Sequence, residues 1–195
     1  MKRICLFCGS SPRLHNGYLD LAGEFGRLLA ARGIELVYGG GSTGLMGAAA
    51  DACLRAGGRV IGVIPGALAR KEVLHEGLTD LRIVGSMHER KALMADLSDG
   101  FAALPGGLGT LDEWFEIWTW AQLGLHDKPI GLLNFHGFFD PLLALLDRMV
   151  EDGFVKPEHR ALAVVETRAD ELTQALAARE PVDSLTPPAT PGGAA

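Results

Sequence analysis

The sequence predicts an α/β fold, a single domain built on a parallel sheet flanked by helices. Short apolar runs typical of buried strands alternate with longer segments whose apolar residues recur at helical spacing. Glycine-rich turns follow several of the apolar runs, where a strand gives way to a helix. Because parallel strands end at the same edge of a sheet, these turns can converge on one ligand cleft.

In the first half of the chain the pattern places three buried strands, one shorter strand and three helices. The strands are expected over 2–7, 34–38, 59–64 and 81–84, and the helices over 16–32, 44–56 and 87–97. The first helix repeats Leu21, Phe25, Leu28 and Leu29 along one side and ends at Gly33. Residues 65–80 form a loop of mixed charge at the carboxyl edge, a place where long loops are often functional.

In the second half the pattern continues with strands and helices in alternation. Strands are expected over 101–104, 129–134 and 162–165, and helices from Thr110 through about residue 121, over 138–150 and over 169–178. From residue 181 the composition changes to PVDSLTPPATPGGAA, which has too few apolar residues to pack. We therefore expect one domain over 1–180 and a disordered tail over 181–195.

Charge and cysteine content exclude several classes of protein. A net charge of −6 argues against general nucleic-acid binding, which needs a basic surface. Lys2 and Arg3 precede only a short apolar run, so we expect no signal peptide and no membrane segment. Three cysteines fit a reducing cytoplasm. Cys5 and Cys8 should face opposite sides of their strand, and the sequence has no second C-x-x-C and no H-E-x-x-H motif, so we expect no metal site. Nothing in the sequence suggests pyridoxal chemistry, and we expect no cofactor.

The stretch 100–123 carries the first candidate site. Pro105 ends a short apolar strand, and Gly106, Gly107 and Gly109 form a turn almost free of side chains before a helix that we expect to start at Thr110. Such a turn lets a ligand reach the backbone, and the helix start offers free N–H groups and a positive dipole end. This combination favours a phosphate site.

Glu113 lies at the border of the apolar face of that helix, whereas Asp112 and Glu116 point to its polar side. A carboxylate beside apolar walls near a phosphate site is a candidate for acid–base work or for stabilising a cation. The alternative is structural, since Thr110 and Glu113 also match the capping box T-x-x-E. The stretch by itself leaves both interpretations open.

Arg90 is the second residue out of place. It lies within the apolar stripe formed by Met87, Leu93, Met94 and Leu97 of the helix over 87–97. Arginine is seldom buried unless it is paired, and its fork binds phosphate or carboxylate with two hydrogen bonds. We favour an anion-binding or catalytic arginine, and the alternative is a salt bridge within the fold.

The segment GGGSTG at 39–44 matches G-x-G-x-x-G after a strand, which raises NAD(P) binding. The acidic residue expected at the end of the next strand is absent, because that strand runs into Pro65 and Gly66, and the motif follows the second strand rather than the first. No G-x-x-x-x-G-K-[ST] motif occurs, so a P-loop NTPase is not expected. We favour a turn that lines a mononucleotide site.

Two motifs together resemble the Lonely Guy (LOG) family of phosphoribohydrolases. The family pattern P-G-G-x-G-T-x-x-E corresponds to Pro105–Glu113, and M-H-x-R-K corresponds to Met87–Lys91. The resemblance covers about residues 3–180, including YGGGSTGLMG at 38–47 and TWAQLGLHDKPIGLLN at 119–134. It implies a Rossmann-like, doubly wound sheet and a homodimer.

The resemblance also implies an activity: hydrolysis of the N-glycosidic bond of nucleoside 5′-monophosphates, AMP or N6-substituted cytokinin ribotides, to free base and ribose 5-phosphate. Members are often mislabelled lysine decarboxylases. The matching catalytic pair is Arg90 and Glu113. The matching substrate-binding positions are Glu72, Arg90, Lys91, Gly106, Gly107, Leu108, Gly109, Thr110, Glu113 and Thr119.

The implied chemistry agrees with the residues. Breaking the N-glycosidic bond builds positive charge on the sugar. Glu113 would stabilise that charge or orient the attacking water, and Arg90 would position the substrate and Glu113. Two rivals are a non-catalytic nucleotide-binding or cofactor-carrier protein on the same fold and an NAD(P)-dependent enzyme.

Overall fold

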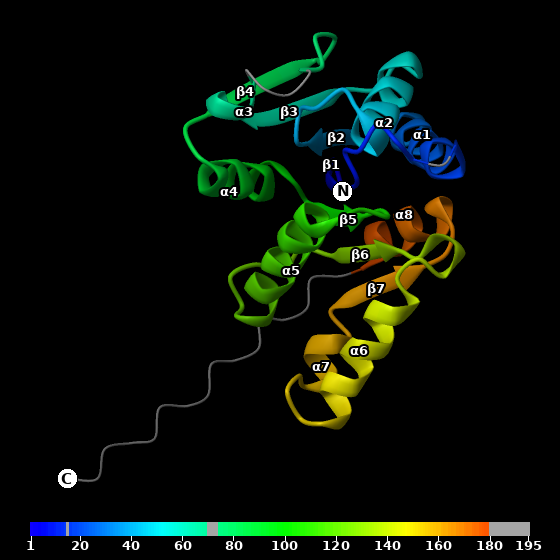
Figure 1. Cartoon of the computed structure of the whole chain (residues 1–195), viewed down its shortest axis with the longest axis vertical. Coiled ribbons are helices and arrows are strands. Elements are labelled where there is room, and N and C mark those ends of the chain that lie inside the picture. The colour runs from blue at the N-terminus through cyan, green and yellow to red at the C-terminus, as the bar shows by residue number, and fades with distance from the viewer. Residues whose placement is uncertain (15, 70–73, 180–195) are drawn as a thin grey trace, which may run out of the picture.

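A computed structural model describes residues 1–14, 16–69 and 74–179 and confirms the predicted α/β architecture (Figure 1). Seven strands form one parallel sheet in the order β4-β3-β2-β1-β5-β6-β7 within these ranges. The strands are β1 Arg3–Phe7, β2 Glu35–Tyr38, β3 Val60–Pro65, β4 Asp80–Val84, β5 Gly100–Ala103, β6 Ile130–Leu133 and β7 Ala163–Glu166. Each agrees with its expected range to within one residue at either end.

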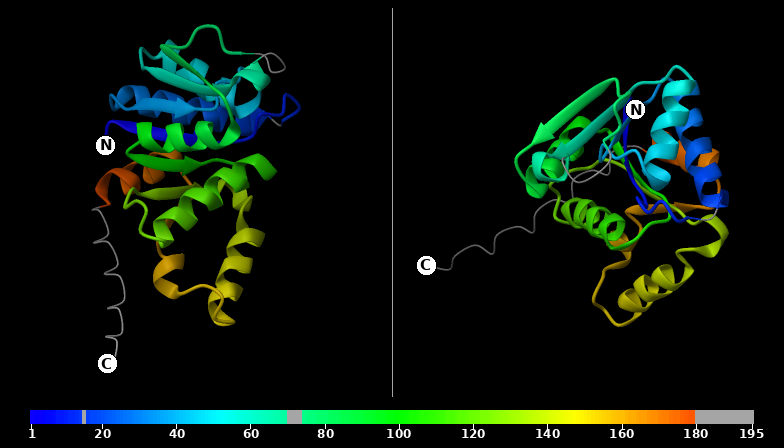
Figure 2. Two further views of the ribbon diagram at one scale, coloured as in Figure 1. Left: turned by 90° about the vertical axis from the view of Figure 1, so that its left-hand side faces the viewer. Right: turned by 45° about the horizontal axis from the view of Figure 1, so that its top comes forward.

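The helices pack on both faces of this sheet (Figure 2). They are α1 Asn16–Ala31, α2 Gly44–Arg55, α3 Gly66–Ala69, α4 Met87–Leu97, α5 Leu108–Gln122, α6 Asp140–Glu151, α7 Pro157–Arg160 and α8 Ala169–Ala178, with a 3₁₀ turn, η1, at Phe135–Gly137. One apolar core lies between the sheet and α1, α2 and α8, and a second lies between the sheet and α4, α5 and α6. Burial on both faces explains why the strands are continuous apolar runs.

The sheet is doubly wound, and β1 and β5 lie side by side where the strand order reverses. Cys5 pairs with Phe101 in the register of these two strands. Beyond their carboxyl ends the two following loops stay in contact, because the Gly9 N–H donates to the Pro105 carbonyl at 3.1 Å. Such a switch point is where open α/β sheets bind ligands.

Several expectations need correction. Helix α5 begins at Leu108 rather than Thr110, and α6 begins at Asp140 because the η1 turn, with His136 at φ 52°, precedes it. The short helices α3 and α7 were not predicted. The predicted tail over 181–195 lies outside the described residues.

The expectation that Cys5 and Cys8 face opposite sides of the sheet is confirmed, since Cys5 belongs to one core and Cys8 to the other. All three cysteines of the chain are free and buried. Among the residues that the structure describes, no helix is long and apolar enough to cross a membrane. Nor does that part of the chain hold a cluster of three or more metal-ligating side chains.

Candidate active site

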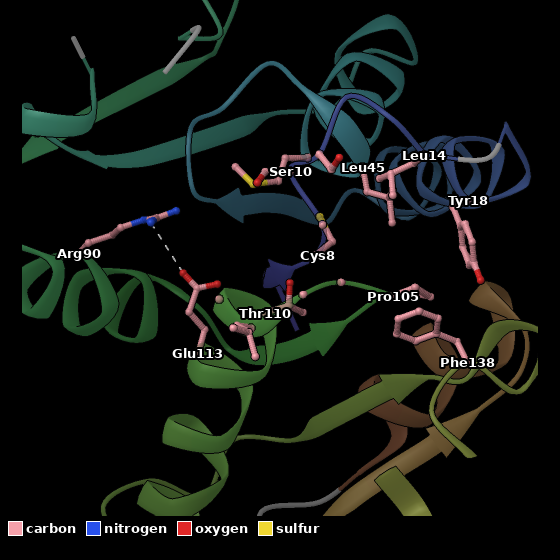
Figure 3. A pocket seen from close by; sticks show the side chains of 17 residues that line it. Cys8, Ser10, Leu14, Tyr18, Leu45, Arg90, Pro105, Thr110, Glu113 and Phe138 are labelled. Atoms are coloured by element: carbon pink, nitrogen blue, oxygen red, sulfur yellow. Dashed lines mark ion pairs between the residues drawn. The ribbon is translucent and has the colours of Figure 1, made fainter. Parts of the chain in front are cut away.

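A cavity of about 570 Å³ opens at the carboxyl ends of β1 and β5 (Figure 3). Its wall combines the loop after β1, the segment from Pro105 into the start of α5, the first turn of α2, and single residues from α1, α4 and the segment before α6. A volume of this size lies within the range of small-molecule sites. The expected convergence on one cleft is therefore confirmed for the turns that follow β1 and β5.

The start of α5 forms the floor of the cavity. Gly107 caps the helix in an extended conformation, and the first bond within the helix runs from the Leu111 N–H to the Gly107 carbonyl at 3.1 Å. The N–H groups of Leu108, Gly109 and Thr110 therefore have no partner within the helix. Leu108 is 88% exposed, so the helix start is open to a ligand. These groups and the helix dipole favour an anion.

The position of the helix start decides the capping-box question. Thr110 lies inside α5 as its third residue, with a buried side chain, and so does not cap the helix. The capping-box alternative, which the sequence left open, is therefore excluded, because Gly107 rather than Thr110 is the N-cap. The Thr110 side chain instead packs against Gly106, where a Cβ would overlap its hydroxyl.

Arg90 is buried, with 9% of the residue exposed, and points from α4 across the ends of two strands. Its Nε donates to the Val63 carbonyl of β3 at 3.2 Å, and its Nη2 donates to the Gly39 carbonyl after β2 at 3.4 Å. A Cβ on Gly39 would overlap the guanidinium. The first glycine of the GGGSTG segment thus makes room for Arg90.

Glu113 faces Arg90 across the cavity, with 3.8 Å between its Oε1 and Arg90 Nη1 (Figure 3). The two side chains are only 13% and 10% exposed, respectively. Burial raises the pKa of Glu113 above its usual range, and the positive charge of Arg90 opposes that rise. The separation exceeds a direct hydrogen bond, so the two side chains interact through their charges and keep hydrogen-bonding capacity for a substrate.

The other family-matched positions are distributed differently. Gly106, Gly107, Leu108, Gly109 and Thr110 all line the cavity. Lys91 lies outside it, with its Nζ 2.9 Å from Glu116 Oε2 and 3.3 Å from Asp112 Oδ2. Thr119 is exposed farther along α5, and it also lies outside the cavity. Glu72 falls outside the described residues.

Residues 39–44 of the GGGSTG segment are not among the residues that line the cavity, whereas Leu45 and Met46, which follow them in α2, do line it. Gly44, at φ +62°, approaches the backbone of residues 9–11 so closely that a side chain would collide with it. The Leu45 N–H donates to the Gly9 carbonyl at 2.9 Å. Because loop 8–11 uses this N–H at the start of α2, the helix is less suited to the pyrophosphate of a dinucleotide.

The end of the cavity away from Arg90 is apolar, and no pattern in the sequence indicated it. Leu14, Tyr18 and Phe138 line it, and the Tyr18 and Phe138 rings meet edge to face with centroids 5.9 Å apart (Figure 3). These residues come from segments about 120 positions apart, and each is typical of an ordinary core position. The cavity therefore joins a charged end, a polar helix start and an aromatic end.

The chain is similar to known proteins over most of its length. A family model described as "Possible lysine decarboxylase" matches residues 46–176. The chain is 54% identical over 181 residues to the probable cytokinin riboside 5′-monophosphate phosphoribohydrolase LOGL9 of Oryza sativa subsp. japonica, covering 93% of this chain and 80% of that protein. It is 50% identical over 182 residues to the cytokinin riboside 5′-monophosphate phosphoribohydrolase LOG5 of Arabidopsis thaliana, with the same coverage.

Solved structures resemble the chain in fold. The molybdenum cofactor carrier protein of Chlamydomonas reinhardtii superposes with a TM-score of 0.68 at 23% identity, covering 91% of this chain and 99% of that one. The molybdenum cofactor binding protein of Rippkaea orientalis gives 0.68 at 21% identity, covering 91% and 96%. At such identities the likeness concerns the fold alone. The family model and the relatives of about 50% identity show that the chain belongs to the LOG family.

Proposed function

We propose that this protein hydrolyses the N-glycosidic bond of cytokinin ribotides, and of AMP, releasing the free base and ribose 5-phosphate. The observation that carries the proposal is the Arg90–Glu113 pair, 3.8 Å apart in the same cavity as the open start of α5. The names of the relatives support the same reaction. The proposal involves no cofactor.

The start of α5 would hold the 5′-phosphate. The free N–H groups of Leu108, Gly109 and Thr110 point outward from the helix end, and the dipole adds a favourable field for a dianion. Glu113 lies one turn farther along the same helix and lines the same cavity. A phosphate fixed at the helix start would therefore orient the attached ribose toward the carboxylate, which lowers the entropic cost of reaching the transition state.

Glu113 would act on the sugar. As the bond between C1′ and the base nitrogen breaks, its electron pair leaves with the base and C1′ gains positive charge. An ionised carboxylate stabilises this charge, and it can accept the proton of the water that adds to C1′. The base takes up a proton as it leaves.

Arg90 would hold Glu113 in its working state. Burial favours the protonated carboxyl, and the guanidinium opposes this by stabilising the negative charge. Val63 and Gly39 fix the guanidinium through two backbone carbonyls. Arg90 therefore supplies a positive charge in a fixed position, which a mobile side chain could not do as well.

We also propose that the protein acts as a homodimer and that it works in the cytoplasm. We further propose that Glu72, Lys91 and Thr119 contribute to substrate binding. Leu123 and Leu125 expose an apolar surface at the end of α5, close in sequence to Thr119, which supports contact with a second copy. Three free, buried cysteines support a reducing compartment.

The test is incubation of the purified protein with AMP and with N6-isopentenyl-AMP, followed by chromatography of the free base. We expect release from both nucleotides, and loss of release in Glu113→Gln. Tight nucleotide binding by the unaltered protein without release of base would instead favour the carrier protein on the same fold. Binding of NAD(H) in preference to these two nucleotides would favour an NAD(P)-dependent enzyme.

A further inference from the structure

The turn Gly39–Gly41, between β2 and α2, is held from two sides. On its inner side the Gly39 carbonyl accepts from Arg90 Nη2. On its outer side Gly41 forms an antiparallel bridge with Leu74, and the His75 N–H donates to the Gly40 carbonyl at 3.2 Å. Because glycines have no side-chain contacts to restrain their backbone, the position of this turn depends on the contacts that other residues make with it.

The His75 side chain fixes the outer contacts in place. Its Nδ1 lies 3.2 Å from the Gly77 N–H and accepts from it, so the proton of the neutral imidazole lies on Nε2. Nε2 is 3.0 Å from Asp51 Oδ1, to which it therefore donates. The imidazole is only 10% exposed. It thus ties residues 74–77 to α2, the helix that follows the glycine turn.

We infer that His75 is a positioning residue: by anchoring residues 74–75 against the Gly39–Gly41 turn, it sets the position of the Arg90 guanidinium relative to Glu113. The inference rests on the proposed function for its effect on turnover. His75 does not line the cavity, so it acts through the turn rather than on the substrate. Loss of the anchor would let the Gly39 carbonyl move, and Arg90 would follow it.

Asp51 provides a matched control for this network. Besides His75, it pairs with Arg55 at 3.6 Å, one helical turn along α2. Both members of that second pair are more than half exposed, so it should contribute little. Arg55→Ala therefore perturbs the same aspartate without releasing residues 74–77.

The kinetic experiment compares His75→Ala, His75→Gln and Arg55→Ala in base release from AMP. We expect His75→Ala to lower kcat about tenfold, the scale of coupling through a packed network, with KM changed less than twofold. His75→Gln should recover most of kcat, because its amide N–H₂ can donate to Asp51 in place of Nε2. Arg55→Ala should match the unaltered protein.

A double variant separates positioning from general destabilisation. If His75 acts through Arg90, His75→Ala should cause no further loss of kcat in an Arg90→Ala background. A tenfold further loss there, or full kcat in the single variant His75→Ala, would overturn the inference.

A second measurement does not depend on turnover. The Arg90 Nε–H signal in a ¹⁵N–¹H spectrum, assigned by its loss in Arg90→Lys, reports the bond to Val63. We expect it to shift or broaden in His75→Ala and to stay unchanged in Arg55→Ala. An unchanged signal in His75→Ala overturns the inference. If the unaltered protein released no base but the signal moved, the proposed function would fail and the positioning role would stand.

Discussion

Replacing Gly39 with alanine should displace the Arg90 guanidinium while leaving the fold intact. The new Cβ would overlap Arg90 Nη2 and would lie 3.1 Å from its Cζ and 3.2 Å from Met46 Cε. Ordinary contacts begin near 3.4 Å, so the guanidinium must withdraw, by on the order of 1 Å once the overlap with Nη2 is relieved. Gly39 is not among the glycines of positive φ, so alanine can adopt its backbone conformation without strain.

The expected effect on catalysis follows from this displacement. A misplacement of about 1 Å in a catalytic constellation can cost about 100-fold in rate. At about 1.36 kcal/mol for each factor of ten, this corresponds to ~2.7 kcal/mol of lost transition-state stabilisation. We therefore expect kcat for base release from AMP to fall about 100-fold, whereas the open start of α5 should still bind the phosphate.

The assay is steady-state base release, with thermal melting as a check on folding. Gly17→Ala is the matched control, because nothing lies within 4 Å of the added Cβ and the residue is exposed on α1. Because Gly17 lies in the first turn of α1, this exchange should change stability little and leave turnover unchanged. A folded Gly39→Ala protein with full kcat would refute the role assigned to the Arg90 position.

Glu113→Gln should lose turnover by a factor of about 100 or more, while its melting temperature at neutral pH should stay the same or rise, because burial disfavours the charge that glutamine lacks. Asp112→Asn changes an exposed side chain and should stay active as the control. Normal turnover in Glu113→Gln would exclude a catalytic carboxylate. Arg90→Lys should lose most activity, because one ammonium cannot replace the separate contacts of Nε, Nη1 and Nη2; near-native turnover in a folded Arg90→Lys would make the arginine structural. AMP should be cleaved far faster than adenosine, because the start of α5 binds only the former through phosphate, and equal kcat/KM would contradict this. Activity should fall as pH falls through the raised pKa of Glu113, because the carboxylate becomes protonated. Arg90→Ala removes the positive charge that lowers this pKa, so a pH–rate profile should show its residual activity being lost at a higher pH than in the unaltered protein.

Much of the fold could be predicted from local pattern. The bounds of α4 and α8 agree with the expected ranges 87–97 and 169–178, and α8 buries one side through Ala169, Leu172 and Leu176. Ser86 caps α4 by accepting from the Glu89 N–H at 3.1 Å, which is a signal readable in the sequence. The order of the strands was not predictable in this way, since register between distant segments leaves no local trace.

The start of α5 shows where local rules fail. Thr110 is a preferred N-cap residue and Gly109 is a poor helix former, so propensity placed the start two residues late. In the structure Gly107 caps the helix and Leu108 stands exposed at its first position. An open, poorly capped helix start is costly for stability but suits anion binding, so the error marks the candidate site.

The site itself was predicted in part. Arg90 and Glu113 stood out because each is a charge on an apolar face, and the structure brings both to one cavity. The roles of Tyr18 and Phe138 in the wall could not be predicted, because an aromatic residue on an amphipathic segment is typical of a core. The placement of Lys91 beside Glu116 was equally hidden, since it depends on how α4 and α5 pack.

The position of β5 beside β1 has a consequence for the order in which the molecule folds. Strands β1 to β4 and their helices precede β5 in the chain, so they can assemble first during synthesis. Until β5 arrives, β1 is the edge of a half-sheet, and its apolar residues Ile4–Phe7 offer unpaired backbone to other chains. The same late, non-local pairing completes the cavity, so the nascent chain acquires its ligand site only when this aggregation-prone edge is covered.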